Sequence, residues 1–300
     1  MNWGIDWGRF ANAGVPGLAF TREALVGDLR ALGVRPGQTL LVHASLRAIG
    51  WVAGGPGTVV AALLDSVGET GTIVMPTTTE ENSTTSRAHL KRIAGMSPRE
   101  VAEYRAQMPA FDRLLSPTTG SGRIAEALRT TPGAVRSDHP QSSFAAIGAR
   151  AEWLMAGHRL TSHLGEESPL AALYGLGDAA VLLLGVGYES CTALHLAEYR
   201  YTGTPPKRIY ECVISADGAR RWVSFCDVIL NDEKFGLIGQ QAEKWIDHRR
   251  WHAGRVGNAK CRLVSLCDLV DFATGWMARY RGEYSPSPDP GPFTKGRQIF

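Results

Sequence analysis

The sequence lacks the features that mark secreted, membrane-spanning and nucleic-acid-binding proteins. Its five cysteines are an odd number with no CxxC spacing, which argues against a disulfide framework and against a zinc ribbon. No apolar run approaches the roughly 20 residues that span a bilayer, and the N-terminus shows no secretory pattern. The net charge of +3 is too small to indicate nucleic acid. We therefore expect a cytoplasmic protein with no membrane or nucleic-acid partner.

Several catalytic signatures are also missing. There is no GxSxG elbow, because Ser45 lies in the sequence HASLR, and no glycine-rich loop ends as a P-loop does. Gly185 and Gly187 follow an apolar run but lack the third glycine of the dinucleotide fingerprint. The eight histidines do not fall in a metal-binding spacing, so we expect no catalytic metal.

The chain does contain ample core material. Apolar residues make up 44% and charged residues 20%, a typical globular balance. A strand at 39–43, a helix at 58–67 and a strand at 71–75 form a strand–helix–strand unit, for which parallel pairing is the default. The sequence therefore predicts an α/β protein with a mixed, largely parallel central sheet flanked by helices.

Further segments are expected around this sheet, within one domain that spans residues 1–300. Two alternating runs at 209–214 and 221–225 flank Asp217-Gly218 and indicate a β-hairpin. The polar segment at about 77–117 indicates an insertion over the strand ends, with a helix at 97–108. Other helices are expected at 21–32, 122–129, 149–156, 168–174, 235–249 and 269–280, and other strands at 144–148 and 260–267. An extended loop is expected at 135–140, and an irregular arm at 1–20 that packs on the body or on another subunit of a homodimer.

The chain is organised around residues 180–200 (AVLLLGVGYESCTALHLAEYR). The run Val181–Leu184 suits a strand buried on both faces, and Thr192–Arg200 is typical of a helix. His195 and Glu198 lie three residues apart and so share a face of that helix. Because ligands of α/β sheets gather beyond the carboxyl ends of strands, His195 is a candidate base. The alternatives are a histidine satisfied by a neighbouring carboxylate and a metal-binding pair.

The sequence offers this base no obvious protein nucleophile. Cys191 lies beside His195 and is either its nucleophile or a small buried residue. A base alone suits a reaction in which the substrate brings the nucleophile, such as an amine that attacks a thioester. The hydroxyl of Thr192, one turn before His195, is a candidate donor to the oxyanion. The carboxylates available to orient the base are Glu198, Glu167 and Asp227.

Six sequence blocks resemble, in order and spacing, those of the antibiotic N-acetyltransferase family. They are LVHASLRAIG (41–50), GTIVMP (71–76), VRSDHP (135–140), FAAIG (144–148), ESPLAAL (167–173) and LLLGVG…TALHLAE (182–198). The best-known members of this family are aminoglycoside 3-N-acetyltransferases, which use acetyl-CoA and have an α/β fold distinct from that of the GNAT enzymes. The resemblance implies acetyl-CoA-dependent N-acetylation of an aminoglycoside-type antibiotic.

The resemblance also implies roles for individual residues. His195 matches the histidine of the family's TxxHxxE motif, the general base, and Thr192 matches its threonine, near the tetrahedral centre; Glu198 completes the motif. Asp227 falls where some members place a glutamate that orients the base or meets the ammonium groups of the substrate. Two loops match those expected to cradle the pantetheine and phosphates of CoA, namely His43, Ala44, Ser45 and Leu46 in one and Arg136, Ser137 and His139 in the other.

Each polar residue of these loops also has a purely structural interpretation. Ser45 and Ser137 can cap local turns. Arg136 can form a surface ion pair, His43 can be a satisfied buried histidine, and His139 before a proline can simply shape its loop.

The sequence leaves the acceptor amine open. The candidate substrate-binding residues are Glu80, Glu81, Asn82, Glu167 and Asp227, although residues 80–82 can equally be a solvated loop. An acidic cleft would favour a polycationic aminoglycoside. A neutral or basic cleft would favour an anionic amine, as in biosynthetic relatives that acetylate small amines such as phosphonates. A non-catalytic binding protein on the same fold is the remaining alternative.

Overall fold

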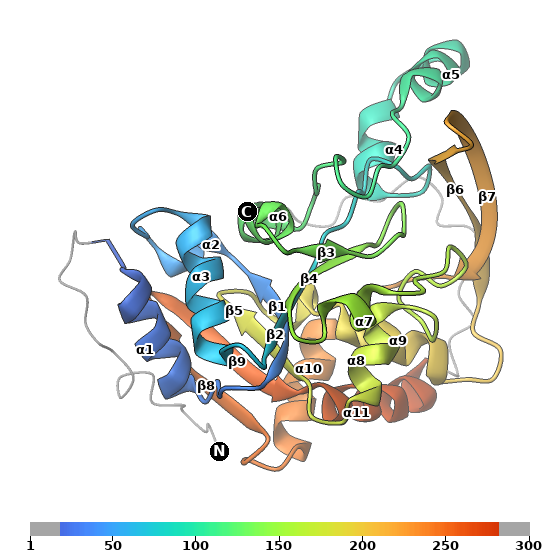
Figure 1. Cartoon of the computed structure of the whole chain (residues 1–300). Coiled ribbons are helices and arrows are strands. Elements are labelled where there is room, and N and C mark those ends of the chain that lie inside the picture. Colours follow the sequence, from blue (N-terminus) through green and yellow to red (C-terminus); the bar gives the residue numbers. More distant parts are fainter. Residues whose placement is uncertain (1–18, 282–300) are drawn as a thin grey trace.

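The computed structural model describes residues 19–281 (Figure 1), so most of the expected N-terminal arm lies outside the described residues. The strands are β1 (Thr39–Ala44), β2 (Thr72–Pro76), β3 (Val135–Arg136), β4 (Phe144–Gly148), β5 (Ala180–Leu184), β6 (Lys207–Ala216), β7 (Ala219–Val228), β8 (Trp251–Val256) and β9 (Ala259–Ser265). The helices are α1 (Arg22–Leu32), α2 (Leu46–Ile49), α3 (Pro56–Val67), α4 (Arg87–Ile93), α5 (Pro98–Gln107), α6 (Gly122–Thr130), α7 (Ala151–Met155), α8 (Pro169–Gly175), α9 (Ala193–Arg200), α10 (Phe235–Trp245) and α11 (Leu266–Tyr280), with a 3-10 turn at Tyr188–Ser190.

Seven strands form one mixed sheet in the order β3-β4-β2-β1-β5-β9-β8. The central strands β2, β1 and β5 run parallel, and Leu41 pairs with both Val74 and Val181. The outer strands pair antiparallel on either side. The predicted α/β fold with a mixed, largely parallel central sheet flanked by helices is confirmed for the three central strands, β2, β1 and β5, while the outer strands are antiparallel. His195 follows β5, the last of the three parallel strands.

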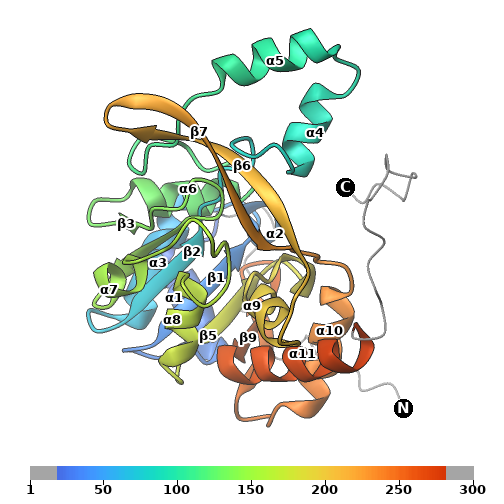
Figure 2. The ribbon, with the colours of Figure 1, turned by 90° about the vertical axis from the view of Figure 1, so that its right-hand side faces the viewer.

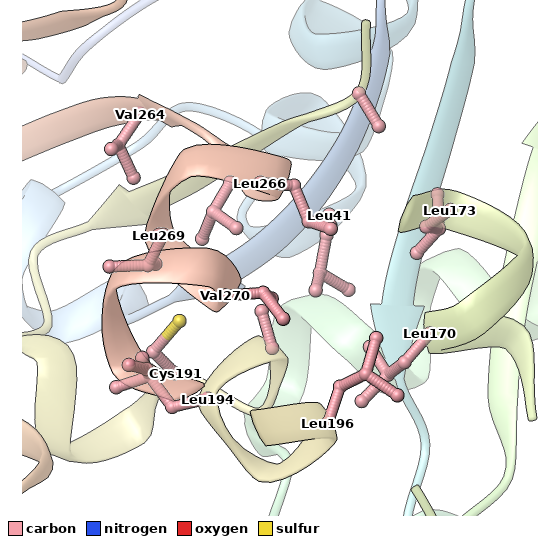
Figure 3. Close-up of a cluster of buried hydrophobic side chains, with 14 of the residues drawn as sticks. Leu41, Leu170, Leu173, Cys191, Leu194, Leu196, Val264, Leu266, Leu269 and Val270 are labelled. Carbon is pink, nitrogen blue, oxygen red and sulfur yellow. The ribbon is translucent and has the colours of Figure 1, made fainter. Parts of the chain in front are cut away.

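Helices bury both faces of this sheet. Leu40 and Leu182 belong to a core shared with α1, α3 and α6, whereas Leu41 and Leu183, one residue along each strand, belong to a core shared with α7 to α11. This alternation explains why β1 and β5 are apolar at nearly every position. Figure 3 shows the second core, in which side chains of α9 and α11 pack over the sheet. Helix α9, which carries His195, is therefore held by apolar packing.

The predicted insertion stands beyond the end of the sheet, beside the β6–β7 hairpin (Figure 2). The side chain of Asn82 anchors it, since its Nδ2 donates to the Val213 carbonyl oxygen at 2.8 Å and its Oδ1 accepts from the Val213 nitrogen at 2.7 Å. Phe111 forms a further bridge to Ile214. Ser97 and Glu100 form the predicted capping box of α5.

The structure corrects the sequence prediction at five places. Helices α2 and α4 were missed, because each is short and α4 is polar. Strand β8 was missed because its sequence, WHAGRV, does not alternate; the Gly257 turn pairs it with β9. The helix predicted over 235–249 ends at Trp245. The loop predicted at 135–140 begins with the two-residue strand β3. The predicted hairpin turn is confirmed, with both Asp217 and Gly218 at positive φ.

Candidate active site

A cleft of about 780 Å³ opens at the carboxyl ends of the parallel strands. Its floor includes the last residues of β1 and β2 and the start of α9, and its walls come from the insertion, the start of α6 and the foot of the hairpin. The polar side chains that line it are His43, Ser45, Arg47, Thr78, Glu80, Ser83, Thr85, Ser86, Arg87, Ser121, Arg123, Gln141, Ser142, His163, Glu189, Ser190, Thr192, His195, Arg208, Tyr210 and Asp232.

His195 lies on the floor of this cleft and is oriented by Glu198. Its Nδ1 is 2.6 Å from Oε2 of Glu198, three residues later on α9. The Glu198 side chain is 1% exposed and that of His195 15%. Because the carboxylate only accepts, the neutral ring carries its proton on Nδ1, and Nε2 is left as a base. Nε2 makes no hydrogen bond to any residue of the described part of the chain.

Glu198, not Asp227, is therefore the carboxylate paired with His195. The second oxygen of Glu198, Oε1, accepts from the backbone nitrogen of Asn231 at 3.0 Å and from Nη1 of Arg281 at 2.5 Å. A carboxylate removed from water needs such donors to remain charged. Phe235 covers the His195 ring, at 4.7 Å between centroids.

Asp227 pairs with a different histidine, His163. Its Oδ2 lies 2.7 Å from both Nδ1 and the backbone nitrogen of His163 and accepts from the Tyr199 hydroxyl at 2.8 Å. Burial alone would raise the pKa of Asp227, but the hydrogen bonds and charge of His163 hold that pKa below its usual value. Nε2 of His163 lies 2.6 Å from the side-chain oxygen of Gln141. Of the three candidate carboxylates, Asp227 is thus paired with His163 and not with His195, because the foot of the hairpin directs it there.

Thr192, at the start of α9, contacts the cleft histidine of β1. Nε2 of His43 lies 3.3 Å from both the backbone nitrogen and the hydroxyl of Thr192. Burial, and then the charge of His195, lower the pKa of His43 to about 3, so this ring is neutral at physiological pH. The backbone N–H can only donate, so Nε2 of His43 accepts it and the ring proton resides on Nδ1. This leaves the Thr192 hydroxyl proton available to a substrate.

Only one of the two loops expected to hold CoA lies at the cleft. His43, Ala44, Ser45 and Leu46 all line it, and the Ser45 hydroxyl also caps α2 through the Ala48 nitrogen.

Arg136, Ser137 and His139 are fully buried and are not part of the cleft lining. Arg136 donates to the Thr77 and Ser116 carbonyl oxygens at 2.7 and 2.6 Å, and burial lowers its pKa to about 10. Ser137 and His139 are satisfied by neighbouring groups. These three residues brace the cleft wall, and their positions give no support to a contact with CoA.

The candidate substrate residues also separate. Glu80 lines the cleft, and burial raises the pKa of its carboxyl. Its carboxylate lies beside Gly120, whose positive φ of 86° is a backbone conformation that favours glycine. Glu81 lines a second cavity, formed by the insertion. Asn82 is buried, and its side chain is hydrogen-bonded to the hairpin. Glu167 forms a half-exposed ion pair with Arg159 away from the cleft.

Cys191 is a structural residue. It is 1% exposed, its sulfur lies among aliphatic side chains (Figure 3), and burial raises the pKa of its thiol to about 12. A thiol in this state is a poor nucleophile. Within residues 19–281 no group of three or more His, Cys, Asp or Glu residues is placed to hold a metal ion.

The comparisons with known proteins agree with this geometry. The family profile described as aminoglycoside 3-N-acetyltransferase matches residues 41–278. The chain belongs to the aminoglycoside 3-N-acetyltransferase family. The resemblance found in the sequence is confirmed, and with it the class of enzyme, an acyltransferase.

Relatives within this acetyltransferase family match over most of their length. The chain is 40% identical over 261 residues to the SPbeta prophage-derived aminoglycoside N(3')-acetyltransferase-like protein YokD of Bacillus subtilis (strain 168), covering 86% of this chain and 92% of that protein. The crystal structure of YokD has a TM-score of 0.82 at 37% identity, over 89% of this chain and 96% of that chain. AAC-IIIb in a binary complex with CoASH has a TM-score of 0.76 at 31% identity, over 90% and 100%. AAC-VIa bound to sisomicin has a TM-score of 0.74 at 32% identity, over 87% and 98%.

Several cleft residues of this acetyltransferase were not predicted from the sequence. They are Arg47, Arg123, Glu189, Arg208, Asp232 and His163, together with Arg281 behind the base. Lone charged residues in loops carry no periodic signal, and Arg281 lies 83 positions from the carboxylate it contacts. None of the described helices is both long and apolar enough to cross a membrane.

Proposed function

We propose that this protein transfers the acetyl group of acetyl-CoA to an amine of an aminoglycoside-type antibiotic, with His195 as the general base. The observation that carries the proposal is the His195–Glu198 pair on the floor of the cleft, with Nε2 directed away from its carboxylate partner. Family membership supplies the reaction class and acetyl-CoA as the acetyl donor. Acetylation removes the positive charge of an ammonium group and so weakens a cationic antibiotic.

The reaction needs no nucleophile from the protein. The acceptor amine attacks the thioester carbonyl carbon while Nε2 of His195 takes a proton from that nitrogen. The carbon–sulfur bond then breaks, the sulfur leaves with the electron pair, and the imidazolium returns the proton to it. The products are the N-acetylated amine and the free thiol of CoA. Glu198 fixes the ring and stabilises the imidazolium formed on the way.

Thr192 is proposed to stabilise the oxyanion of the tetrahedral intermediate. Its hydroxyl lies one turn before the base, on the same side of the cleft. His43, held neutral by burial, takes the Thr192 backbone N–H and leaves the hydroxyl proton for the substrate. A preorganised donor of this kind stabilises the transition state more than the ground state.

CoA is proposed to enter along the His43–Leu46 loop and the start of α6. The first turn of α6 faces the cleft at Ser121 and Gly122, and its nitrogens favour an anion. Arg47 and Arg123 line the same part of the cleft and supply positive charge for the phosphates. In this arrangement the thioester lies between the loop and α9.

The acceptor is proposed to occupy the side of the cleft beneath the insertion. Glu80, Glu189 and Asp232 line the cleft and supply negative charge for an aminoglycoside. The Arg87–Asp232 pair, at 2.8 Å, joins the insertion to the loop before α10. We propose that the insertion at about 77–117 sets the choice of acceptor, while α9 sets the chemistry.

Arg208 favours a second class of acceptor, an amine that also carries an anionic group. It lines the cleft at the foot of the hairpin, with its guanidinium 5.5 Å from the centre of the Tyr210 ring, and has no carboxylate partner among the described residues. An acceptor that carries an anionic group beside its amine, such as an aminophosphonate, would use this charge.

A thiol-release assay with acetyl-CoA tests the proposal directly. The panel contains aminoglycosides with a free 3-amino group, the same compounds blocked at that position, and small aminophosphonates. We expect thiol release with the free aminoglycosides, one acetyl group in the product by NMR, and loss of both in His195→Ala. Release with aminophosphonates and none with any aminoglycoside would overturn the proposed acceptor.

The location, the oligomeric state and the number of domains are proposed from the sequence. We propose that the protein is cytoplasmic, that each chain folds as a single domain, and that two chains form a homodimer. Light scattering on the purified chain reports the mass, and one cooperative unfolding transition is expected.

A further inference from the structure

The carboxylate behind the base is held from an unexpected direction, by the end of the last described helix. Nη1 of Arg281, directly after α11, donates to Oε1 of Glu198 at 2.5 Å. Nη2 of the same guanidinium donates to the Asn231 and Glu233 carbonyl oxygens at 2.9 and 3.1 Å. The Asn231 nitrogen in turn donates to Glu198. One arginine thus binds both the carboxylate and the loop that wraps around it.

We propose that Arg281 is a positioning residue of the acetyltransferase, which acts on the base through Glu198. This inference rests on the proposed role of His195 as the base. Arg281 has no place in the cleft lining and touches neither substrate in our proposal. Its function is to hold Glu198 as an anion in the orientation that keeps the His195 proton on Nδ1.

The charges around the pair support this assignment. Glu198 faces His195 on its own helix, Arg281 from the end of α11, and the hydroxyls of Tyr201 and Tyr210. His195 also interacts with His43 across the cleft floor, and that ring is neutral. Arg281 is therefore the counter-ion of a buried carboxylate in the resting enzyme. Removing one partner of a buried pair leaves an uncompensated charge, which disturbs geometry as well as energy.

The same arginine reaches the rim of the cleft. Arg281 binds the carbonyl oxygens of Asn231 and Glu233, the two neighbours of Asp232. Asp232 lines the cleft and pairs with Arg87 of α4. Arg281 thereby holds the loop at 231–233 next to Glu198. Loss of its two hydrogen bonds to the loop carbonyl oxygens would make both the loop and Glu198 less well ordered.

The test compares Arg281→Ala and Arg281→Lys with Arg279→Ala, a matched control. Arg279 lies two residues earlier on the same helix, is exposed and makes no ion pair with a described residue. We expect Arg281→Ala to lower kcat by about 10-fold to 100-fold, since misplacement of a catalytic group by about an ångström has an effect of that size. The KM for acetyl-CoA should change little, Arg281→Lys should recover part of the rate, and Arg279→Ala should match the wild type.

The pH profile separates positioning from general damage to the fold. Without Arg281 the charge of Glu198 favours the imidazolium form of His195, which is inactive as a base. The acidic limb of kcat/KM should therefore move to higher pH, and the loss in rate should shrink as the pH rises. A profile that superimposes on the wild type would overturn the inference, as would an Arg281→Lys variant no better than alanine.

A double-variant cycle shows whether Arg281 acts through Glu198. In a Glu198→Gln background, Arg281→Ala should cost far less than in the wild type, because its target is already altered. Equal losses in both backgrounds would mean an independent structural effect and would refute the inference. If instead His195→Ala keeps full turnover, the proposed function itself fails, and the two failures are thereby distinguishable.

Discussion

The Nε2 atom of His43 lies 3.3 Å from both the backbone nitrogen and the hydroxyl oxygen of Thr192. The contact joins the end of β1 to the start of α9, the two elements between which the thioester is proposed to lie. Through this contact the buried His43 holds Thr192 next to His195, the proposed base. The same contact places the ring proton of His43 on Nδ1.

His43 should support the rate without appearing in the pH–rate profile. Its pKa is about 3, far below the assay range, because burial and the neighbouring His195 disfavour its charged form. We expect His43→Ala to lower kcat by about 10-fold through a less ordered Thr192. Steady-state kinetics from pH 6 to 9 should show the same limbs as the wild type. A lost or displaced limb would mean that His43, not His195, titrates in the reaction.

The same histidine should weaken the fold in acid. In the unfolded chain His43 takes up a proton near pH 6.5, whereas in the folded protein its pKa is about 3. Its contribution to stability is therefore intact above pH 6.5 and is lost as the pH falls toward 3, by up to about 1.4 kcal/mol per pH unit for one proton. Denaturant unfolding at pH 4.5 and 7.5 should show a smaller pH dependence in His43→Asn than in the wild type. An identical dependence in the two proteins would contradict this account.

Asp227 should matter more to stability than to the base. It is buried and accepts hydrogen bonds from His163 and Tyr199. We expect Asp227→Ala to lower the free energy of unfolding by about 2–4 kcal/mol, because it leaves buried donors unpaired.

The turnover of the folded fraction tells the two carboxylates apart. Asp227→Asn should lose less turnover than Glu198→Gln, with unfolding monitored by circular dichroism. The reverse order would show that Asp227, not Glu198, orients His195 in the working enzyme.

The insertion should govern the acceptor rather than CoA. Asn82 joins it to the hairpin through two hydrogen bonds to Val213. We expect Asn82→Ala to raise the KM for the acceptor several-fold and to leave the affinity for CoA within about two-fold. The control is Glu103→Ala, on the exposed face of α5. Equal changes for both substrates would make the insertion part of the general scaffold.

Much of the active helix could be predicted from the sequence because its geometry is local. Thr192, His195 and Glu198 repeat at three-residue intervals, and the helical period places them on one side of α9. The apolar runs of β1 and β5 likewise predict strands buried on both faces. Short polar elements such as α4 and β8 escaped prediction, since tertiary contacts rather than periodicity form them.

The partners of the site residues could not be predicted in this way. Asp227 was one of three candidates to orient His195, yet the hairpin brings it to His163, 64 positions earlier. Arg136 was expected at CoA, yet its side chain is buried behind the cleft. Such pairings depend on how distant loops meet, and a single sequence carries no signal for them.

The turnover and CoA affinity of a folded His195→Ala sample show directly whether His195 is the base. General-base assistance is typically about 10²–10⁴-fold. We therefore expect a loss of that size in kcat, about 3–5 kcal/mol at 1.36 kcal/mol per tenfold. The affinity for CoA should be nearly unchanged, because the base faces the acceptor amine. A His195→Ala enzyme with near-wild-type turnover would show that His195 is not the base and that the base lies elsewhere.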